Sequence, residues 1–182
     1  MRSAAACLAL LLTLLPTQPL LAVELKDILN YHFIDESLSS AGQVQREHIE
    51  AVAEAGFELV INLGPADKDY NEDEGFMISE QGIAYVNIPV IWDAPTQQDL
   101  QLFFDIMDAR GARKTLVHCY ANYRASAFTY LYRVLQLGVP EAEARERLDA
   151  VWSDEAFAAY PMWRELIDDA LAGNFAISSA EN

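Results

Sequence analysis

The chain has 182 residues, with 12 Lys and Arg against 28 Asp and Glu, so its formal net charge is −16 at pH 7. This charge argues against binding to nucleic acid or to an anionic membrane surface, since both would repel it. The apolar fraction of 52% is enough for a hydrophobic core and excludes a disordered chain. Two cysteines and three scattered histidines provide neither a disulfide framework nor the spacing of a zinc site.

The N-terminal segment has the layout of a secretory signal peptide. It begins with Arg2, continues with an apolar run over residues 4–15, and ends on the small residue Ala22 just before the first acid. We therefore expect residues 1–22 to be removed and residues 23–182 to form one exported domain, periplasmic or secreted, without stable membrane insertion. An uncleaved membrane anchor is the alternative, although the apolar run alone is too short to span a bilayer.

The rest of the chain alternates between strand and helix signals. Short apolar or β-branched runs predict strands over residues 57–63, 83–88 and 115–118. Amphipathic periodicity, glycine stops and a capping pattern predict helices over residues 43–55, 97–109, 123–136, 141–151 and 162–172. The acidic segment 66–75 is expected to form a loop, followed by a short helical turn over 77–81. This alternation predicts a three-layer α/β domain with a mostly parallel sheet flanked by helices.

Cys119, the one cysteine after the predicted signal peptide, follows a buried strand at the place where α/β proteins bind ligands. If the backbone turns from Cys119 into a helix at Tyr123, successive N–H groups bind an anion and favour the thiolate. Arg124 adds a fork of donors for a phosphoryl or sulfuryl group. Asn122 tolerates the left-handed conformation that such a loop needs without glycine, and His118 would bond the loop carbonyls from below. Otherwise Cys119 is a small buried hydrophobe and Arg124 a surface residue.

The segment from His118 to Arg124, with four residues between cysteine and arginine, resembles the signature loop of cysteine-dependent phosphatases, which usually have five. Further segments carry the resemblance: Ser40-Ala41-Gly42-Gln43, Ala55-Gly56-Phe57, Val60-Ile61-Asn62-Leu63, Gly82-Ile83-Ala84-Tyr85 and Ile88-Pro89-Val90. Together they are similar to a bacterial family of dual-specificity-phosphatase-like proteins with the short loop, some named as phosphatases and others as sulfurtransferases. The chain departs from that family at Asn122, where glycine is usual, and at Gly64, where arginine is common.

The resemblance implies a cysteine-dependent phosphatase of the tyrosine or dual-specificity type. The Cys119 thiolate would attack a phosphomonoester and form a phosphocysteine that water hydrolyses, while Arg124 and the loop N–H groups hold the phosphate oxygens. The segment around Asp93 resembles the mobile acid loop of tyrosine phosphatases, so Asp93 is the candidate general acid, with Asp67 and Asp69 as weaker alternatives. The candidate phosphate-binding residues are His118, Tyr120, Ala121, Asn122, Tyr123 and Ser126.

This chemistry needs no metal or organic cofactor, and its partner is a phosphorylated small molecule or a phosphoprotein, with phosphotyrosine among the candidates. Ser126 would assist by hydrogen bonding to the departing sulfur. Sulfur transfer through a Cys119 persulfide is the alternative enzyme function, because rhodanese-type loops also have four residues between cysteine and arginine and need no general acid. A third function, a catalytically weak phosphate-binding module, is favoured by the missing loop glycine.

Overall fold

The computed structural model describes residues 23–173. The predicted signal peptide over residues 1–22 lies outside the described residues and stays a prediction. No helix within the described range is long and apolar enough to cross a membrane.

A five-stranded sheet forms the centre of the domain, in the order β1-β2-β5-β3-β4. Its strands are β1 (His32–Asp35), β2 (Leu38–Ala41), β3 (Leu59–Asn62), β4 (Ala84–Asn87) and β5 (Thr115–His118). The edge strand β1 pairs antiparallel with β2, whereas the other neighbours pair in parallel. The carboxyl ends of β2, β3 and β5 are therefore side by side, with His118 in register with both Ala41 and Asn62.

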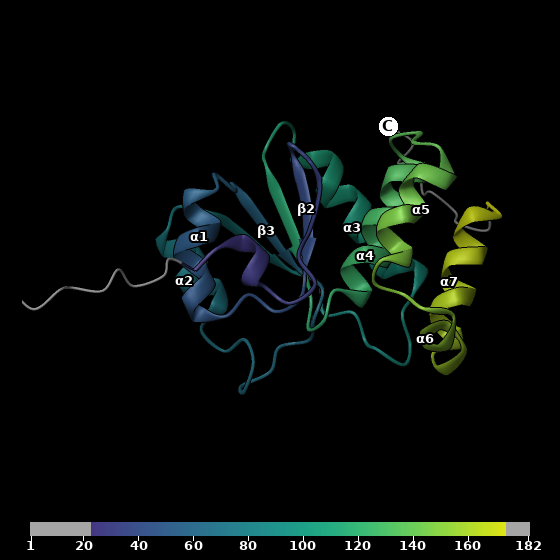
Figure 1. Cartoon of the computed structure of the whole chain (residues 1–182), viewed down its shortest axis with the longest axis horizontal. Coiled ribbons are helices and arrows are strands. Elements are labelled where there is room, and N and C mark those ends of the chain that lie inside the picture. Colours follow the sequence, from purple (N-terminus) through teal and green to yellow (C-terminus); the bar gives the residue numbers. More distant parts are fainter. Residues whose placement is uncertain (1–22, 174–182) are drawn as a thin grey trace, which may run out of the picture.

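Helices cover both faces of this sheet, as Figure 1 shows: α1 and α2 lie on one side and α3 to α7 on the other. The helices are α1 (Ile49–Glu54), α2 (Glu74–Glu80), α3 (Gln97–Ala109), α4 (Tyr123–Leu135), α5 (Glu141–Asp149), α6 (Asp154–Ala159) and α7 (Pro161–Leu171). Two 3-10 turns precede β1 and α1, at Leu25–Asp27 and Arg46–His48. The three-layer, mostly parallel α/β fold predicted from the sequence is confirmed.

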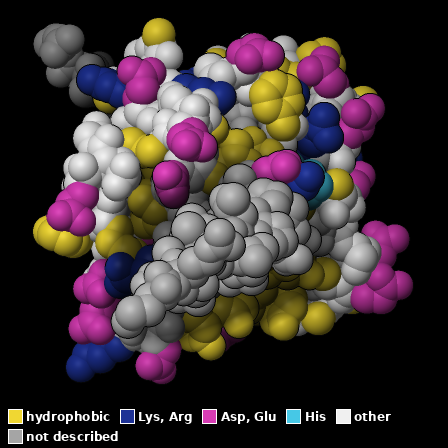
Figure 2. Space-filling model, turned by 60° about the vertical axis from the view of Figure 1, so that its left-hand side comes forward, with side chains coloured by type: hydrophobic (Ala, Val, Ile, Leu, Met, Phe, Trp, Pro, Cys, Tyr) yellow, Lys and Arg dark blue, Asp and Glu magenta, His cyan; other side chains and the backbone are white. Residues whose placement is uncertain are grey.

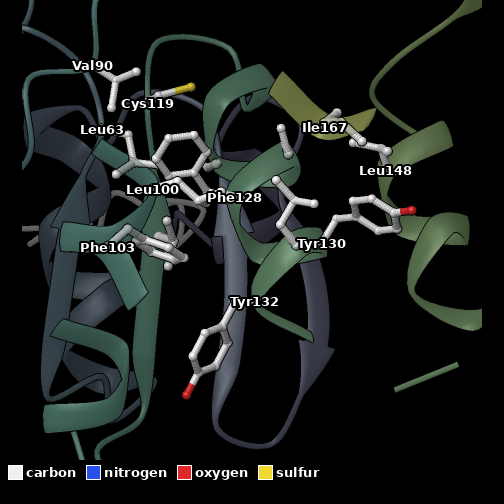
Figure 3. Packing of buried hydrophobic residues seen from close by; sticks show 14 of the residues in the cluster. Leu63, Val90, Leu100, Phe103, Cys119, Phe128, Tyr130, Tyr132, Leu148 and Ile167 are labelled. Carbon is white, nitrogen blue, oxygen red and sulfur yellow. The ribbon is translucent and has the colours of Figure 1, made fainter. Parts of the chain in front are cut away.

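The larger hydrophobic core lies between the sheet and α3, α4 and α7. Phe103, Phe104 and Phe128 are almost completely buried in it, and Trp163 packs beside Phe128 with their ring centroids 6.1 Å apart. Figure 3 shows Cys119 beside Leu63 and Val90 at one end of this core, far from Tyr132 at the other. The carboxyl end of β5 is thus anchored in the largest packed cluster of the described chain.

Most predicted elements agree with the structure, but the first helix is shorter than expected. It was predicted over residues 43–55, yet α1 begins only at Ile49, after the 3-10 turn. The reason is that the backbone N–H of Gln43 donates to the carbonyl of Tyr120, so this residue is tied to the cysteine segment. The predicted turn over 77–81 is part of the longer α2, which begins inside the acidic segment at Glu74.

Candidate active site

Cys119 follows the last residue of the central strand β5. Its side chain is buried, and its backbone N–H donates to the carbonyl of Ala41 on β2 at 3.3 Å. The carbonyl of His118 accepts from the N–H of Leu63, after β3, at 2.8 Å. Both neighbouring strands therefore fix the point at which the chain leaves the sheet. We call residues 119–124 the cysteine loop.

Asn122 gives the cysteine loop its turn into α4. Its φ of 70° places it in the left-handed region, which confirms the conformation predicted for the position where glycine is absent. Its side-chain amide donates to the carbonyl of Asn30 at 2.7 Å and to the hydroxyl of Ser40 at 3.1 Å. Asn30 returns the contact by donating to the carbonyl of Ala121 at 3.1 Å. Two asparagines thus stabilise a loop that glycine would have formed without side-chain help.

Several backbone donors of the cysteine loop have no partner. Within residues 23–173, no acceptor takes a hydrogen bond from the backbone N–H of Tyr120, Ala121, Tyr123 or Arg124. Those of Tyr123 and Arg124 belong to the first turn of α4, where no intrahelical acceptor exists. Free N–H groups at the start of a 13-residue helix form an anion-binding position next to Cys119.

The Arg124 side chain is held by its inner nitrogen. Nε donates to the carbonyl of Val90 at 3.0 Å, and Cζ lies 5.0 Å from the centre of the Trp92 ring. The two terminal NH₂ groups make no hydrogen bond with any described residue. A guanidinium fixed at Nε and stacked on an indole presents its remaining donors in a fork suited to a tetrahedral anion.

Cys119 and Arg124 meet in one pocket of about 410 Å³, which we call the aromatic pocket. Its lining consists of Trp92, Cys119, Tyr120, Ala121, Tyr123, Arg124 and Tyr160. Arg124 is the one permanently charged side chain among these lining residues. Acidic side chains are scattered over the molecular face shown in Figure 2, and the net charge of the chain is negative. The positive charge of Arg124 inside the aromatic pocket is therefore opposite in sign to the net charge of the chain.

Two loop neighbours form contacts other than those predicted. The His118 ring does not bond the loop carbonyls; its Nε2 lies 2.7 Å from Oε1 of Glu74, beneath the loop. The hydroxyl of Ser126 donates to the carbonyl of Tyr123 at 3.1 Å, as a serine in the first turn of a helix can, and not to the Cys119 sulfur.

The candidate acids lie at the margin of the site. Asp93 follows the pocket residue Trp92 but is exposed and does not line the aromatic pocket. Asp67 is also exposed, and it lines a smaller pocket of about 170 Å³ that shares Tyr120 and Arg124 with the aromatic pocket. Asp69 lines neither of these two pockets.

Sequence reasoning missed Glu74, which was one of five acids in a segment expected to be a solvated loop. It is 2% exposed, whereas Asp67, Asp69, Glu72 and Asp73 are exposed. Its position at the start of α2, followed by the buried Ile78 one turn later, was the signal that could have indicated it. Within the described residues, no group of three or more His, Cys, Asp or Glu side chains is arranged to hold a metal ion.

Comparisons with known proteins agree with this architecture. No protein-family model matches the chain. A curated relative, the beta-lactamase hydrolase-like protein of Xylella fastidiosa, is 30% identical over 106 residues, which are 56% of this chain and 24% of the relative. The chain therefore spans about a quarter of that relative's length.

Solved structures cover far more of the chain. A protein of the DUF442 family from Shewanella putrefaciens CN-32, named as a candidate phosphatase, is 37% identical with a TM-score of 0.75, over 82% of this chain and 93% of that one. P. aeruginosa TpbA, solved with pTyr, has a TM-score of 0.66 at 13% identity, over 87% of this chain and 95% of its own. The chain thus belongs to the DUF442 family, and its fold is that of the tyrosine-phosphatase-like proteins.

Proposed function

We propose that the chain is a cysteine-dependent phosphatase that hydrolyses a phosphomonoester. The observation that carries this proposal is the meeting of Cys119 and Arg124 in one pocket, with unpartnered loop N–H groups between them. Such donors bind three non-bridging oxygens of a phosphate while the thiolate faces phosphorus. The likeness to a DUF442 protein named as a candidate phosphatase supports the same activity.

The reaction has two steps, formation of a phosphocysteine and its hydrolysis. The Cys119 thiolate forms a sulfur–phosphorus bond as the bond from phosphorus to the leaving oxygen breaks, and that oxygen takes a proton from a general acid. Water then attacks phosphorus and gives a proton to the carboxylate that the general acid has become, while the sulfur–phosphorus bond breaks and leaves inorganic phosphate and the thiolate. Arg124 and the loop N–H groups stabilise the charge that spreads over the equatorial oxygens in both transition states.

Asp93 is our candidate for the general acid, with Asp67 as the alternative. Asp93 belongs to the segment whose Trp92 ring lines the aromatic pocket and whose Val90 carbonyl holds Arg124. Asp67 adjoins Arg124 from the opposite side, through the smaller pocket.

The pocket lining indicates the kind of leaving group. Its walls are the rings of Trp92, Tyr123 and Tyr160 together with Tyr120. Aromatic walls favour a flat apolar ester over a polyanion, so an aryl phosphate such as phosphotyrosine fits the site, free or on a protein. The uncleaved sequence carries the proposed export signal, which would bring the enzyme to the periplasm or the medium.

The test is hydrolysis of 4-nitrophenyl phosphate by the wild-type chain and by Cys119→Ser. We expect turnover in the wild type and none above background in the variant, because serine lacks a reactive thiolate. Binding of vanadate or phosphate without turnover would identify a phosphate-binding module instead. Equal slow rates in both chains would contradict the phosphatase.

Sulfur transfer is the second candidate, and the observation that favours it is the short loop. Four residues separate Cys119 from Arg124, and the shorter ring of N–H groups suits a persulfide sulfur better than a phosphate. Transfer of the outer sulfur of thiosulfate to Cys119 and then to cyanide, yielding sulfite and thiocyanate, would demonstrate it. A chain that is active on thiosulfate and inactive on aryl phosphates would replace the first proposal with this one.

A further inference from the structure

A buried carboxylate lies directly beneath the cysteine loop. Oε2 of Glu74 accepts hydrogen bonds from the side-chain amides of Gln43 at 3.0 Å and Asn62 at 3.1 Å. Its other oxygen, Oε1, lies 2.7 Å from Nε2 of His118, an ion-pair distance without the alignment of a hydrogen bond, and Nδ1 of the same ring has no partner among the described residues. These three partners come from the ends of neighbouring segments: Gln43 follows β2, Asn62 ends β3 and His118 ends β5. Together with Tyr85 of β4, whose hydroxyl accepts from Asn62 at 3.1 Å, they form what we call the buried polar network.

The charge of Glu74 has one candidate for compensation. No lysine or arginine of the described chain pairs with this carboxylate. Gln43, Asn62 and Tyr85 are uncharged, so His118, which is fully buried, is the group in the network that can carry a positive charge. A buried carboxylate without a cation is strongly disfavoured, and a proton on the imidazole would offset part of that penalty.

The Glu74 carboxylate also affects the pKa of Tyr85. Burial in the first place and the nearby Glu74 carboxylate in the second raise the pKa of Tyr85 to about 12. A negative charge on Glu74 would oppose the formation of a tyrosinate at Tyr85. Tyr85 is therefore a second reporter of the charge on Glu74, independent of Cys119.

Glu74 reaches the cysteine loop by two routes. One passes through His118, which is bonded covalently to Cys119. The other passes through Gln43, whose side chain donates to Glu74 and whose backbone N–H donates to the carbonyl of Tyr120 at 3.0 Å. Glu74 thus contacts both the residue that precedes the thiol and the residue that holds the carbonyl of Tyr120.

We propose that Glu74 is a positioning residue for Cys119, which holds His118 in its protonated form beneath the cysteine loop and so keeps a positive charge beside the thiolate. The inference rests on Cys119 as the reacting thiol of the proposed function. It applies to a phosphocysteine and to a persulfide alike, because both require the thiolate. Its test can therefore be run without turnover.

The first measurement uses the pH dependence of alkylation of Cys119 by iodoacetamide, followed by mass spectrometry on the peptide that contains it, so that Cys7 does not contribute. In Glu74→Gln we expect alkylation at pH 6 to slow about tenfold, with an unchanged limiting rate at high pH, because a neutral His118 no longer favours the thiolate. Glu72→Gln, an exposed neighbour in the same segment, is the matched control and should keep the wild-type profile.

A double variant separates action through His118 from general loosening of the fold. His118→Gln should slow alkylation at pH 6 to a similar degree, and adding Glu74→Gln to it should have no further effect. A further tenfold loss in the double variant would mean that Glu74 acts by another route. A Glu74→Gln chain that melts at lower temperature but keeps the wild-type alkylation profile would reduce Glu74 to a structural residue.

The second measurement needs no substitution at Glu74. Nitrogen-15 NMR of histidine-labelled wild-type chain at pH 7 should show both ring nitrogens of His118 protonated, with the signal identified by its loss in His118→Gln. The spectrum of a neutral imidazole would overturn the proposal, even if Glu74→Gln failed to fold. An absence of phosphatase activity in the wild-type chain would leave this result unaffected, so the two proposals fail separately.

Discussion

On its open side, the cysteine loop faces the rings of Trp92, Tyr123 and Tyr160; on its closed side, it rests on Glu74 and His118, both removed from solvent. Aromatic side chains thus surround the solvent-accessible pocket, while a glutamate and a histidine are buried beneath the loop in a domain whose cores are otherwise apolar. This is the reverse of the usual distribution of residue types in a globular domain.

The inversion follows from what each side has to do. The aromatic pocket has to bind a ligand, and its rings supply contact area around a single cation, Arg124. The buried polar network has to hold the loop, and its hydrogen bonds from Gln43 and Asn62 to Glu74 have fixed directions that apolar packing lacks. We therefore expect substitutions on the open side to change turnover and substitutions on the closed side to change stability or thiol reactivity.

The largest effect is expected on the open side, from Arg124→Lys. Lysine keeps the charge but loses the fork and the Nε bond to Val90, so kcat/KM for 4-nitrophenyl phosphate should fall by about 10²–10³-fold with little change in stability.

Arg133→Lys is its matched control, because Arg133 is on the same helix and equally buried but bonds to Ala144 and Glu143, away from the pocket. Its turnover should match that of the wild type. If Arg124→Lys lowered the free energy of unfolding by as much as it raised the activation free energy of hydrolysis, the two sides of the loop would not have separate roles in turnover and in stability.

The next effect concerns the leaving group. Asp93→Asn should slow hydrolysis of phenyl phosphate, which needs a proton on its leaving oxygen, by about 10²-fold. It should slow 4-nitrophenyl phosphate much less, because nitrophenolate leaves without help.

Asp67→Asn is the comparison for this prediction, measured with the same two esters. If Asp67→Asn shows the selective loss and Asp93→Asn does not, the general acid approaches from the smaller pocket. Equal rates for both variants and the wild type would exclude both carboxyls.

The third effect is on stability and concerns Asn122, where the cysteine loop turns into α4. Asn122→Ala would force a left-handed alanine and remove two hydrogen bonds, so the free energy of unfolding should drop by about 2–3 kcal/mol. Asn122→Gly removes the bonds but not the backbone conformation, and should lose about 1–2 kcal/mol. Urea denaturation of the two variants gives the order, and a more stable alanine variant would refute this account of the turn.

The elements that could be predicted from the sequence are those whose conformation depends on residues close to them in the chain. The β5 strand, the bounds of α3 and the left-handed Asn122 were all predicted, because each depends on residues within a few positions of it. The pairing of Cys119 with Arg124 in one pocket also depends on short spacing, since a strand, a loop and the first turn of a helix suffice to bring them together.

The regions that it missed depend on contacts between distant segments. Strands β1 and β2 and helix α6 were not predicted; β2 contains the buried serines Ser39 and Ser40, which give no hydrophobic pattern and are held by pairing with β5. The burial of Glu74 likewise depends on Gln43, Asn62 and His118, none of which is near it in the sequence.

The smallest effect is a titration on the closed side. Because the pKa of Tyr85 is raised from 10 to about 12 in the folded chain, its contribution to stability is complete below pH 10 and is lost as the pH rises through 12. Tyr130, on the other face of the sheet, also titrates at about 12, mainly through burial and secondarily through Glu141. Carbon-13 NMR of labelled tyrosine should show that Glu74→Gln lowers the pKa of Tyr85 and leaves that of Tyr130 unchanged, since only Tyr85 contacts the buried polar network. An unchanged pKa of Tyr85 would mean that Glu74 carries no charge in the folded protein. The contrast between the two sides of the loop would then be one between aromatic groups and neutral polar groups.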